Sequence, residues 1–590
     1  MKCWRSLDGT EDYDFAHSTM KTMRTDIPSG NVPCGYRPCN KAMVLICLVM
    51  LIGVLVISRT DIMLSSDCGP ELSALIGGEN LATYGFVKLR FLGVHYPGPP
   101  GDAPPYYLHY PPLPEILNGF LFRLGIQDLC FLRFIHGMLF VAGLVFMYAA
   151  LGPFIGYAAI ACGCGALATT TLFFEYSTSV HTHAYNMLFI GMFFFFFFRA
   201  ADKGNSAREW VLCWVVLFLS SLTSFEFILY PLVFAFVYLL VEGKIKACWL
   251  SLVLLGLAPV AGVGFHFAQN CWAIGWSAAV SDKMGFGARG GGISAGNLAA
   301  LRGLPTQVLQ VAWRQLHIGW PSLVILSGVF LALRRHVFPK HGAHARGLVL
   351  GLLAASGAWY LFMPEFVVSH RCCADQLVPL FIVVIGMSVS LMLNSLARGN
   401  MNTAGKTIVI SGFVLSIVLY QAYFLKPKFT NTRSVAQRIP RVIGAGAFPP
   451  KTSLVISDDI AWAFNYYCKR AGWPFGKGNG LNRDFLLSRQ KYLAGTCAIR
   501  HFLYYAEDGG YLEDPLFQDL ARRFEGKAKD FRSPGNASAR LILFDVGVLL
   551  GPDDLHLPLE EQARMNQLKG VFPVWEIAGF DERLAKEFGE

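Results

Sequence analysis

Two acidic side chains open the first long loop of this sequence, at positions where they could perform acid–base chemistry. Asp67 and Glu71 lie four residues apart in the segment SDCGPELSALI, so both carboxylates would share one face of a helix. At a partly desolvated site, one carboxylate could act as a general base and take a proton from an attacking hydroxyl. The alternative is a helix whose first turn carries favourably placed acids. The pattern leaves both interpretations open.

Histidines beside a carboxylate suggest a different chemistry in a later loop. His181 and His183 form the sequence HTH, and Glu175 precedes them. Imidazole and carboxylate groups bind divalent metals, so a metal site is possible here. A two-residue separation is a poor ligand spacing on a helix, and the same pair could instead contact a substrate or serve the structure. The sequence identifies no metal cofactor with certainty.

The elements that must position these residues are mainly apolar helices. The chain has 590 residues, of which 54% are hydrophobic and 15% charged, and its mean hydropathy is positive. A lipid-embedded body explains this balance. The formal net charge of +10 does not indicate nucleic acid as a partner, because Lys and Arg are concentrated in short loops between apolar runs.

About eleven apolar stretches approach the length that crosses roughly 30 Å of hydrocarbon. The run of phenylalanines from Phe193 to Phe198 is expected to face lipid. Basic residues occur in every second connection, namely Arg199, Lys203 and Arg208; Lys244 and Lys246; Arg334, Arg335, Lys340 and Arg346; and Arg398 and Lys406. By the positive-inside rule these connections face the cytoplasm and the alternate ones face outward. The expected location is a cell inner membrane, with the N-terminus inside.

The pattern divides the chain into three parts. Residues 1–40 are a cytoplasmic tail, and residues 41–425 are a transmembrane part with large outer loops at 58–128 and 269–319. Residues 426–590 form an outer, periplasmic domain, in which three expected strands alternate with two expected helices: SLVISD, IAWAFNYYCKRAG, IRHFLYYAE, LFQDLARRFEG and RLILFDVG. This order predicts a small soluble α/β domain, and Cys468 and Cys497 within it could form a disulfide.

Several motifs resemble one superfamily of membrane enzymes. The segment YYLHYPPLPEILNGFLFRLG, residues 106–125, is similar to the HPPL-type segment of the C-type membrane glycosyltransferases (GT-C), which include protein O-mannosyltransferases and the lipid A aminoarabinose transferase. Asp67 falls where that superfamily has its first-loop acid. The superfamily often has an adjacent Asp-Glu pair, whereas Cys68 follows Asp67 here, so the second acid would be Glu71 or be absent. HRCCADQLVPLF and FNYYCKRAG, at 370–381 and 464–472, resemble its late outer loop and a segment of its outer domain.

The resemblance implies a GT-C-like fold and transfer of a sugar from a polyprenyl-phosphate donor to a lipid, glycan or protein acceptor at the outer membrane face. It implies that Asp67 is the general base, and Glu71 is the second catalytic candidate, with no role assigned to it by the resemblance. Arg371 is the first candidate for the donor phosphate, because the planar guanidinium group can bind two phosphate oxygens. The candidate donor or substrate contacts are His109, Arg371, Lys88, Arg90, His181 and His183. Arg371, Lys88, Arg90 and His109 could instead anchor the chain at the membrane interface, whereas Arg133 is expected to be structural.

Two further functions fit an apolar chain of this kind. A transporter or flippase of lipid-linked saccharide would show internal repeats and ionisable residues near the bilayer midplane, and neither pattern is clear. A non-catalytic membrane anchor for the outer domain would make Asp67 dispensable. The sequence does not identify the sugar, the acceptor or the oligomeric state.

Overall fold

The protein is described from a computed structural model, which covers most of the helical part and shorter segments of the C-terminal part. The described residues are 40–60, 62, 68–97, 104, 106–202, 206–225, 228–289, 338–362, 375–387, 405, 419, 423, 452–456, 461–469, 472–474, 484, 486–487, 498–506, 512–524, 528–533 and 536–545. The candidates Asp67 and Arg371 lie outside them.

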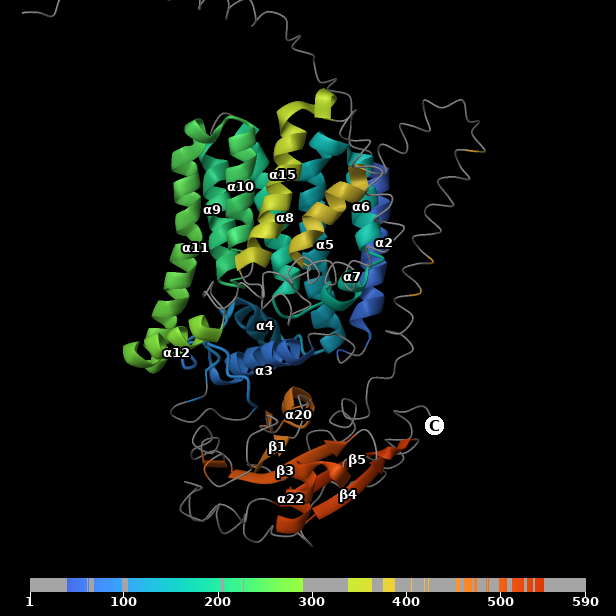
Figure 1. The fold of residues 1–590 in the computed structure, drawn as a ribbon, viewed down its shortest axis with the longest axis vertical. Coiled ribbons are helices and arrows are strands. Elements are labelled where there is room, and N and C mark those ends of the chain that lie inside the picture. Colours follow the sequence, from blue (N-terminus) through green and yellow to red (C-terminus); the bar gives the residue numbers. More distant parts are fainter. Residues whose placement is uncertain are drawn as a thin grey trace, which may run out of the picture.

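The apolar segments form a bundle of helices (Figure 1). Its helices are α2 (Asn40–Ser58), α5 (Leu129–Ile155), α6 (Tyr157–Leu167), α8 (His183–Asp202), α9 (Ala207–Ser221), α10 (Leu229–Val241), α11 (Ile245–Ile274) and α15 (Phe338–Phe362). Among the described residues, α5, α8 and α11 are long and apolar enough to cross a membrane. The 27 residues of α5 and the 30 of α11 correspond to roughly 40 and 45 Å of helix.

The surface of α11 indicates contact with lipid. Large apolar side chains are exposed along it, among them Trp249, Leu250, Leu254, Leu257 and Val260. A row of this kind is costly in water and favourable against acyl chains. The protein is therefore a membrane protein. The total of about eleven spans remains a prediction, because the spans expected at 320–333 and 406–424 lie wholly or mostly outside the described residues.

Most of the phenylalanine run of α8 is buried rather than facing lipid as the sequence suggested. Phe193, Phe194, Phe197 and Phe198 are buried, and the rings of the last three meet Phe234 or Tyr238 of α10, whereas Phe195 and Phe196 are partly exposed. The expectation was wrong because a helical run of identical residues covers every side of the helix, so some of its rings point toward neighbouring helices.

Glycines allow α5 and α8 to approach closely. A Cβ atom added to Gly143 would lie 2.3 Å from the carbonyl oxygen of Met187, and one added to Gly191 would lie 2.1 Å from that of Gly143. Such contacts require glycine on both helices. This packing fixes the first turn of α8, which begins at His183.

The expected single span from Phe154 to Phe174 is divided in the structure. Gly156, with φ of +105°, separates α5 from α6, and Thr170 starts the short helix α7 (Thr171–Tyr176) by accepting a hydrogen bond from the Phe173 amide at 3.2 Å. A glycine outside the helical region and a threonine N-cap explain the two breaks.

Further helices cross one end of the bundle (Figure 1). They are α3 (Cys68–Tyr84), α4 (Leu113–Arg123) and α12 (Trp276–Arg289). Together with α7 and the adjoining loops, these helices are termed the end layer. The end layer contains most of the described site candidates.

The strands of the C-terminal part lie beyond the end layer (Figure 1). They form a five-stranded sheet in the order β2-β1-β3-β5-β4, with β1 (Thr452–Ile456), β2 (Gly472–Pro474), β3 (Ala498–Ala506), β4 (Ala528–Ser533) and β5 (Asn536–Asp545). β1 pairs in parallel with β2 and β3, and the other pairs are antiparallel. Helices α20 (Ala461–Tyr467) and α22 (Pro515–Arg523) accompany the sheet. Whether this unit is a soluble outer domain remains a prediction.

Candidate active site at one end of the helical bundle

Connections that the charge pattern assigns to one side of the membrane meet in the end layer. Asn118 Nδ2 of α4 donates to the carbonyl oxygen of Val180 at 3.0 Å, and the Leu113 amide donates to that of Leu222 at 3.2 Å. His183 Nδ1 lies 2.6 Å from Asp375 Oδ2, across 192 residues of sequence. Loops that are far apart in the chain therefore build one site.

Of the two predicted acids, only Glu71 is among the described residues. Asp67 precedes α3 in the chain and lies outside them, so its predicted role is not tested by the geometry. Glu71 is in the first turn of α3 and is only 1% exposed. The positive end of the helix dipole favours a negative charge at this position. Glu71 is thus a buried acid within the end layer.

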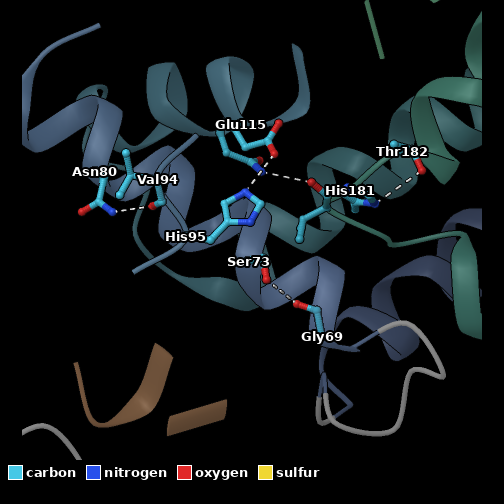
Figure 2. A network of polar contacts seen from close by, with 10 residues as sticks. Gly69, Ser73, Asn80, Val94, His95, Glu115, His181 and Thr182 are labelled. Carbon is cyan, nitrogen blue, oxygen red and sulfur yellow. Dashed lines mark hydrogen bonds and ion pairs between the residues drawn. The ribbon is translucent and has the colours of Figure 1, made fainter. Parts of the chain in front are cut away.

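A buried histidine–glutamate pair occupies the middle of the end layer (Figure 2). His95 Nε2 lies 3.3 Å from Glu115 Oε1, and both side chains are almost fully buried. The Tyr107 ring stacks on the His95 ring with centroids 4.3 Å apart. A Cβ atom on Gly77 would come within 2.9 Å of Glu115 Cγ, so α3 fits the pair only because this residue is glycine. Neither residue stands out in the sequence.

An asparagine fixes the strand-like segment that carries His95. Asn80 Nδ2 of α3 donates to the carbonyl oxygens of Val94 at 2.6 Å and Tyr96 at 2.8 Å, and Figure 2 shows the first of these bonds. A buried side-chain amide of this kind holds an irregular backbone that cannot bond to itself. Asn80 was not predicted from the sequence, because a single asparagine in a helix carries no distinctive spacing.

The two histidines of the HTH motif point to different partners. His183 is buried against Asp375, and its ring lies 4.4 Å from the Tyr176 ring. His181 is half-buried, and its ring meets the Tyr110 ring edge-on, with the two ring centroids 6.4 Å apart. Among the described residues, no group of three or more His, Cys, Asp and Glu side chains could hold a metal ion. A divalent metal remains possible for the chain as a whole.

The predicted cations also have different environments. Lys88 is exposed in the turn after α3, whereas Arg90 Nη1 donates to the backbone carbonyls of Trp272 and Ala273 at the end of α11. Arg133 is buried and donates to the carbonyls of Ser58 and Thr60 and to Thr178 Oγ1. These bonds join three segments of the chain, in agreement with the structural role predicted for Arg133.

His109 lies between the first loop and α12. Its Nδ1 atom is 3.8 Å from Asp282 Oδ1, and its ring meets Tyr107 edge-on at 5.6 Å. Burial raises the pKa of the nearby Tyr106 phenol, and the positive charge of Arg90 offsets part of that rise. The tyrosine therefore stays neutral at physiological pH and acts only through hydrogen bonds and ring contacts.

Helix α20 of the C-terminal part packs against α3. Ala463 of α20 joins a buried cluster with Leu72 and Leu75, and Lys469 Nζ contacts Glu79 Oε2. The pKa of Tyr466 is raised to about 12 by burial and by the negative charges of Glu79 and Asp128. Cys468 is buried, and the predicted disulfide is untested because Cys497 lies outside the described residues.

Comparison with known proteins adds information on the fold. No protein-family model matches the sequence, and no curated protein matches it. Among solved structures, ArnT from Cupriavidus metallidurans bound to undecaprenyl phosphate matches with a TM-score of 0.52 at 13% identity, over 87% of this chain and 100% of that chain. The fold is of the GT-C type. This confirms the fold that the sequence motifs suggested.

Two further structures complete the comparison. ArnT in the apo state matches with a TM-score of 0.50 at 13% identity, over 87% of this chain and 99% of that chain. The oligosaccharyltransferase of Archaeoglobus fulgidus in complex with Zn and sulfate gives a TM-score of 0.49 at 13% identity, over 85% of this chain and 72% of that chain.

Proposed function

We propose that this protein is a membrane glycosyltransferase that moves a sugar from a polyprenyl-phosphate-linked donor to a lipid, glycan or protein acceptor. The observation that carries the proposal is the match to ArnT bound to undecaprenyl phosphate, which extends over 87% of this chain and the whole of that chain. The convergence of the candidate residues in the end layer adds support, because a GT-C-type bundle with one polar end offers a place for a lipid phosphate.

In this proposal the reaction is a single displacement at the anomeric carbon. The Asp67 carboxylate takes the proton of the acceptor hydroxyl as its oxygen attacks that carbon. The bond between the anomeric carbon and the donor phosphate oxygen breaks, and the lipid phosphate leaves with the electron pair. Glu71 assists from the first turn of α3. A leaving phosphate needs cations to stabilise its charge rather than an acid to protonate it.

The cations and imidazoles of the site are assigned by their surroundings. Arg371 and the exposed Lys88 are proposed as phosphate contacts, and the half-buried His109 and His181 as sugar or phosphate contacts. His183, which pairs with Asp375, would position the loop that carries His181. We further propose that the end layer faces the periplasm and that the N-terminus is cytoplasmic.

The test is sugar transfer from a radiolabelled polyprenyl-phosphate sugar in membranes that contain wild-type protein or the Asp67→Asn variant. A carboxamide cannot accept the proton, so transfer should fall by roughly 10²–10⁴-fold. Each donor is tested with a panel of acceptors, with and without an added divalent cation. The amount of folded protein is measured in parallel by size-exclusion chromatography in detergent.

A matched control is Asp519→Asn, which removes a carboxylate from α22. Asp519 pairs only with Arg522 and Arg523 of the same helix among the described residues, at 2.9 and 3.0 Å. Its replacement should leave transfer unchanged. Normal transfer by Asp67→Asn would exclude Asp67 as the base. No transfer by the wild type with any donor would favour a transporter or an anchor.

A further inference from the structure

The C-terminal part of α11 binds both ends of the loop that carries His95. At one end, Gln269 Nε2 donates to the carbonyl oxygens of Arg90 at 3.0 Å and Phe91 at 2.9 Å. At the other end, the Leu108 carbonyl oxygen lies 3.0 Å from His266 Nε2 and 3.3 Å from Asn270 Nδ2. One helix therefore fastens the loop at two points that are 17 or more residues apart in the sequence.

Arg90, in turn, binds α11 through its side chain. Its guanidinium group donates to the carbonyl oxygens of Trp272 and Ala273, the latter at 2.5 Å, and lies 6.0 Å from the centroid of the Trp272 ring. Both carbonyls belong to the last turn of α11, where no amide of the helix is available to bond to them. A positive charge is favoured at this end of a helix. Arg90 thus caps α11.

The backbone is strained at Arg90 and Phe91, whose carbonyl oxygens accept the Gln269 hydrogen bonds. Arg90 and Phe91 have φ values of +56° and +57°, in the left-handed region that non-glycine residues rarely adopt. Two consecutive residues in that region persist only when surrounding contacts over-determine the conformation. Gln269 binds the carbonyl oxygens of both strained residues, and the Arg90 side chain binds the helix that carries Gln269. The contacts are reciprocal.

We propose that Arg90 and Gln269 form a clasp that holds residues 88–91 in this conformation and so positions Lys88 at the site. Arg90 is then a positioning residue, and its charge is used at the end of α11. Lys88 lies two residues before Arg90 and has an exposed side chain. The conformation that the clasp holds therefore sets the position of the Lys88 amine. The contact of Lys88 with the donor phosphate rests on the proposed function, whereas the existence of the clasp does not depend on that function.

The test compares Arg90→Lys, Gln269→Ala and the double variant in the purified full-length protein. Arg90→Lys keeps the charge and the trypsin site but loses the fork that spans two carbonyls. Gln269→Ala leaves the sequence of the turn unchanged. Cleavage by trypsin between residues 88 and 91 should become faster in each variant. At saturating donor, kcat for sugar transfer should fall about tenfold or more, because a small displacement of a positioning group lowers the rate strongly.

The double variant and a matched arginine control sharpen the result. If both residues act through one clasp, the double variant should be no worse than either single variant. Arg123→Lys changes another arginine of the end layer, which is exposed and lies 5.6 Å from the Phe86 ring centroid, and it should behave as wild type.

Three outcomes would overturn the proposal. Wild-type cleavage in Gln269→Ala would show that the clasp does not hold the turn. Faster cleavage with unchanged kcat would show that it holds the turn without positioning the site. A raised donor KM in Arg90→Lys alone, with Gln269→Ala normal, would make Arg90 a phosphate contact. If the wild type transfers no sugar, the proposed function fails, while the trypsin comparison still decides whether the clasp exists.

Discussion

At the scale of single residues, the carboxyl group of Glu71 is held in an environment unlike that of an exposed loop acid. It is 1% exposed and lies in the first turn of α3. Glu71→Gln keeps the shape of the side chain and removes its charge. We expect transfer to fall by roughly tenfold, at the low end of acid–base effects, because Glu71 assists the site without accepting the proton. The measurement is kcat at saturating donor in membranes with quantified protein.

The comparison variant for this prediction is Glu71→Asp, which retains the charge and should recover part of the lost activity. A loss in Glu71→Gln as complete as that in Asp67→Asn would move the role of base to Glu71. Wild-type activity in Glu71→Gln would remove Glu71 from the site altogether.

The pair formed by His183 and Asp375 should matter for stability. The two side chains are nearly fully buried, and their closest atoms are 2.6 Å apart. Removing one partner of a buried, hydrogen-bonded pair costs about 3 kcal/mol or more, because the other partner is left desolvated. Asp375→Ala should therefore lower the apparent melting temperature in detergent by several degrees, with Asp375→Asn lowering it less. The exposed-pair control Asp519→Ala should show almost no shift, and an equal shift in the control would refute the argument.

Residue types and spacings singled out several residues that lie in the end layer, but not the buried pair in its middle. Acids four apart and a histidine pair stand out in a sequence, whereas His95 and Glu115 are 20 residues apart and meet only in the folded chain. Gly77 does not stand out in the sequence either. It matters because a Cβ atom at this position would lie only 2.9 Å from Glu115 Cγ. Pairings of this kind depend on tertiary packing, which a local pattern does not encode.

At the scale of elements, the packing of α20 on α3 connects the C-terminal part to the end layer of the bundle. A Cβ atom on Gly69 would lie 2.9 Å from Trp462 Cδ1, so a side chain at this position would push the two helices apart. Gly69→Val should lower transfer about tenfold or more, because the displaced turn also carries Glu71. It should also make the C-terminal part easier to release with protease.

The matched control is Gly165→Val in α6, where an added Cβ meets no atom within 4 Å. It makes the same chemical change in a helix of the bundle without a clash, and it should keep both activity and protease resistance. Equal behaviour of the two variants would show that the α3–α20 contact contributes nothing to the site.

Element types were predicted better than element boundaries. The three expected strands coincide with β1, β3 and β5, which are rich in apolar and aromatic residues. β2 and β4 were missed, since GWP is too short to show alternation and AKDFRS is mostly polar. The break in the expected span from Phe154 to Phe174 comes from Gly156 and Thr170, whose effects on backbone geometry are stronger than the uniform hydropathy around them.

At the scale of the whole molecule, the structure and the charge pattern lead to one prediction about orientation. Arg199 lies in the last turn of α8, and Lys244, which directly precedes α11, donates to the Ala201 carbonyl oxygen near the same helix end. The helices of the end layer cross the other end of the bundle (Figure 1). The positive-inside rule then assigns the basic end to the cytoplasm. The end layer, and the C-terminal part packed on it through α20, should face the periplasm.

The orientation is measured with epitope tags placed before Met1 and after Glu590, in spheroplasts treated with protease from outside. We expect the C-terminal tag to be removed without detergent, because the C-terminal part is expected on the outer face, and the N-terminal tag to be removed only after the membrane is dissolved. Removal of both tags without detergent, or of neither, would contradict an odd number of spans. Removal of the N-terminal tag alone would place the end layer in the cytoplasm, away from an acceptor on the outer face, and the proposed reaction would have to use cytoplasmic substrates.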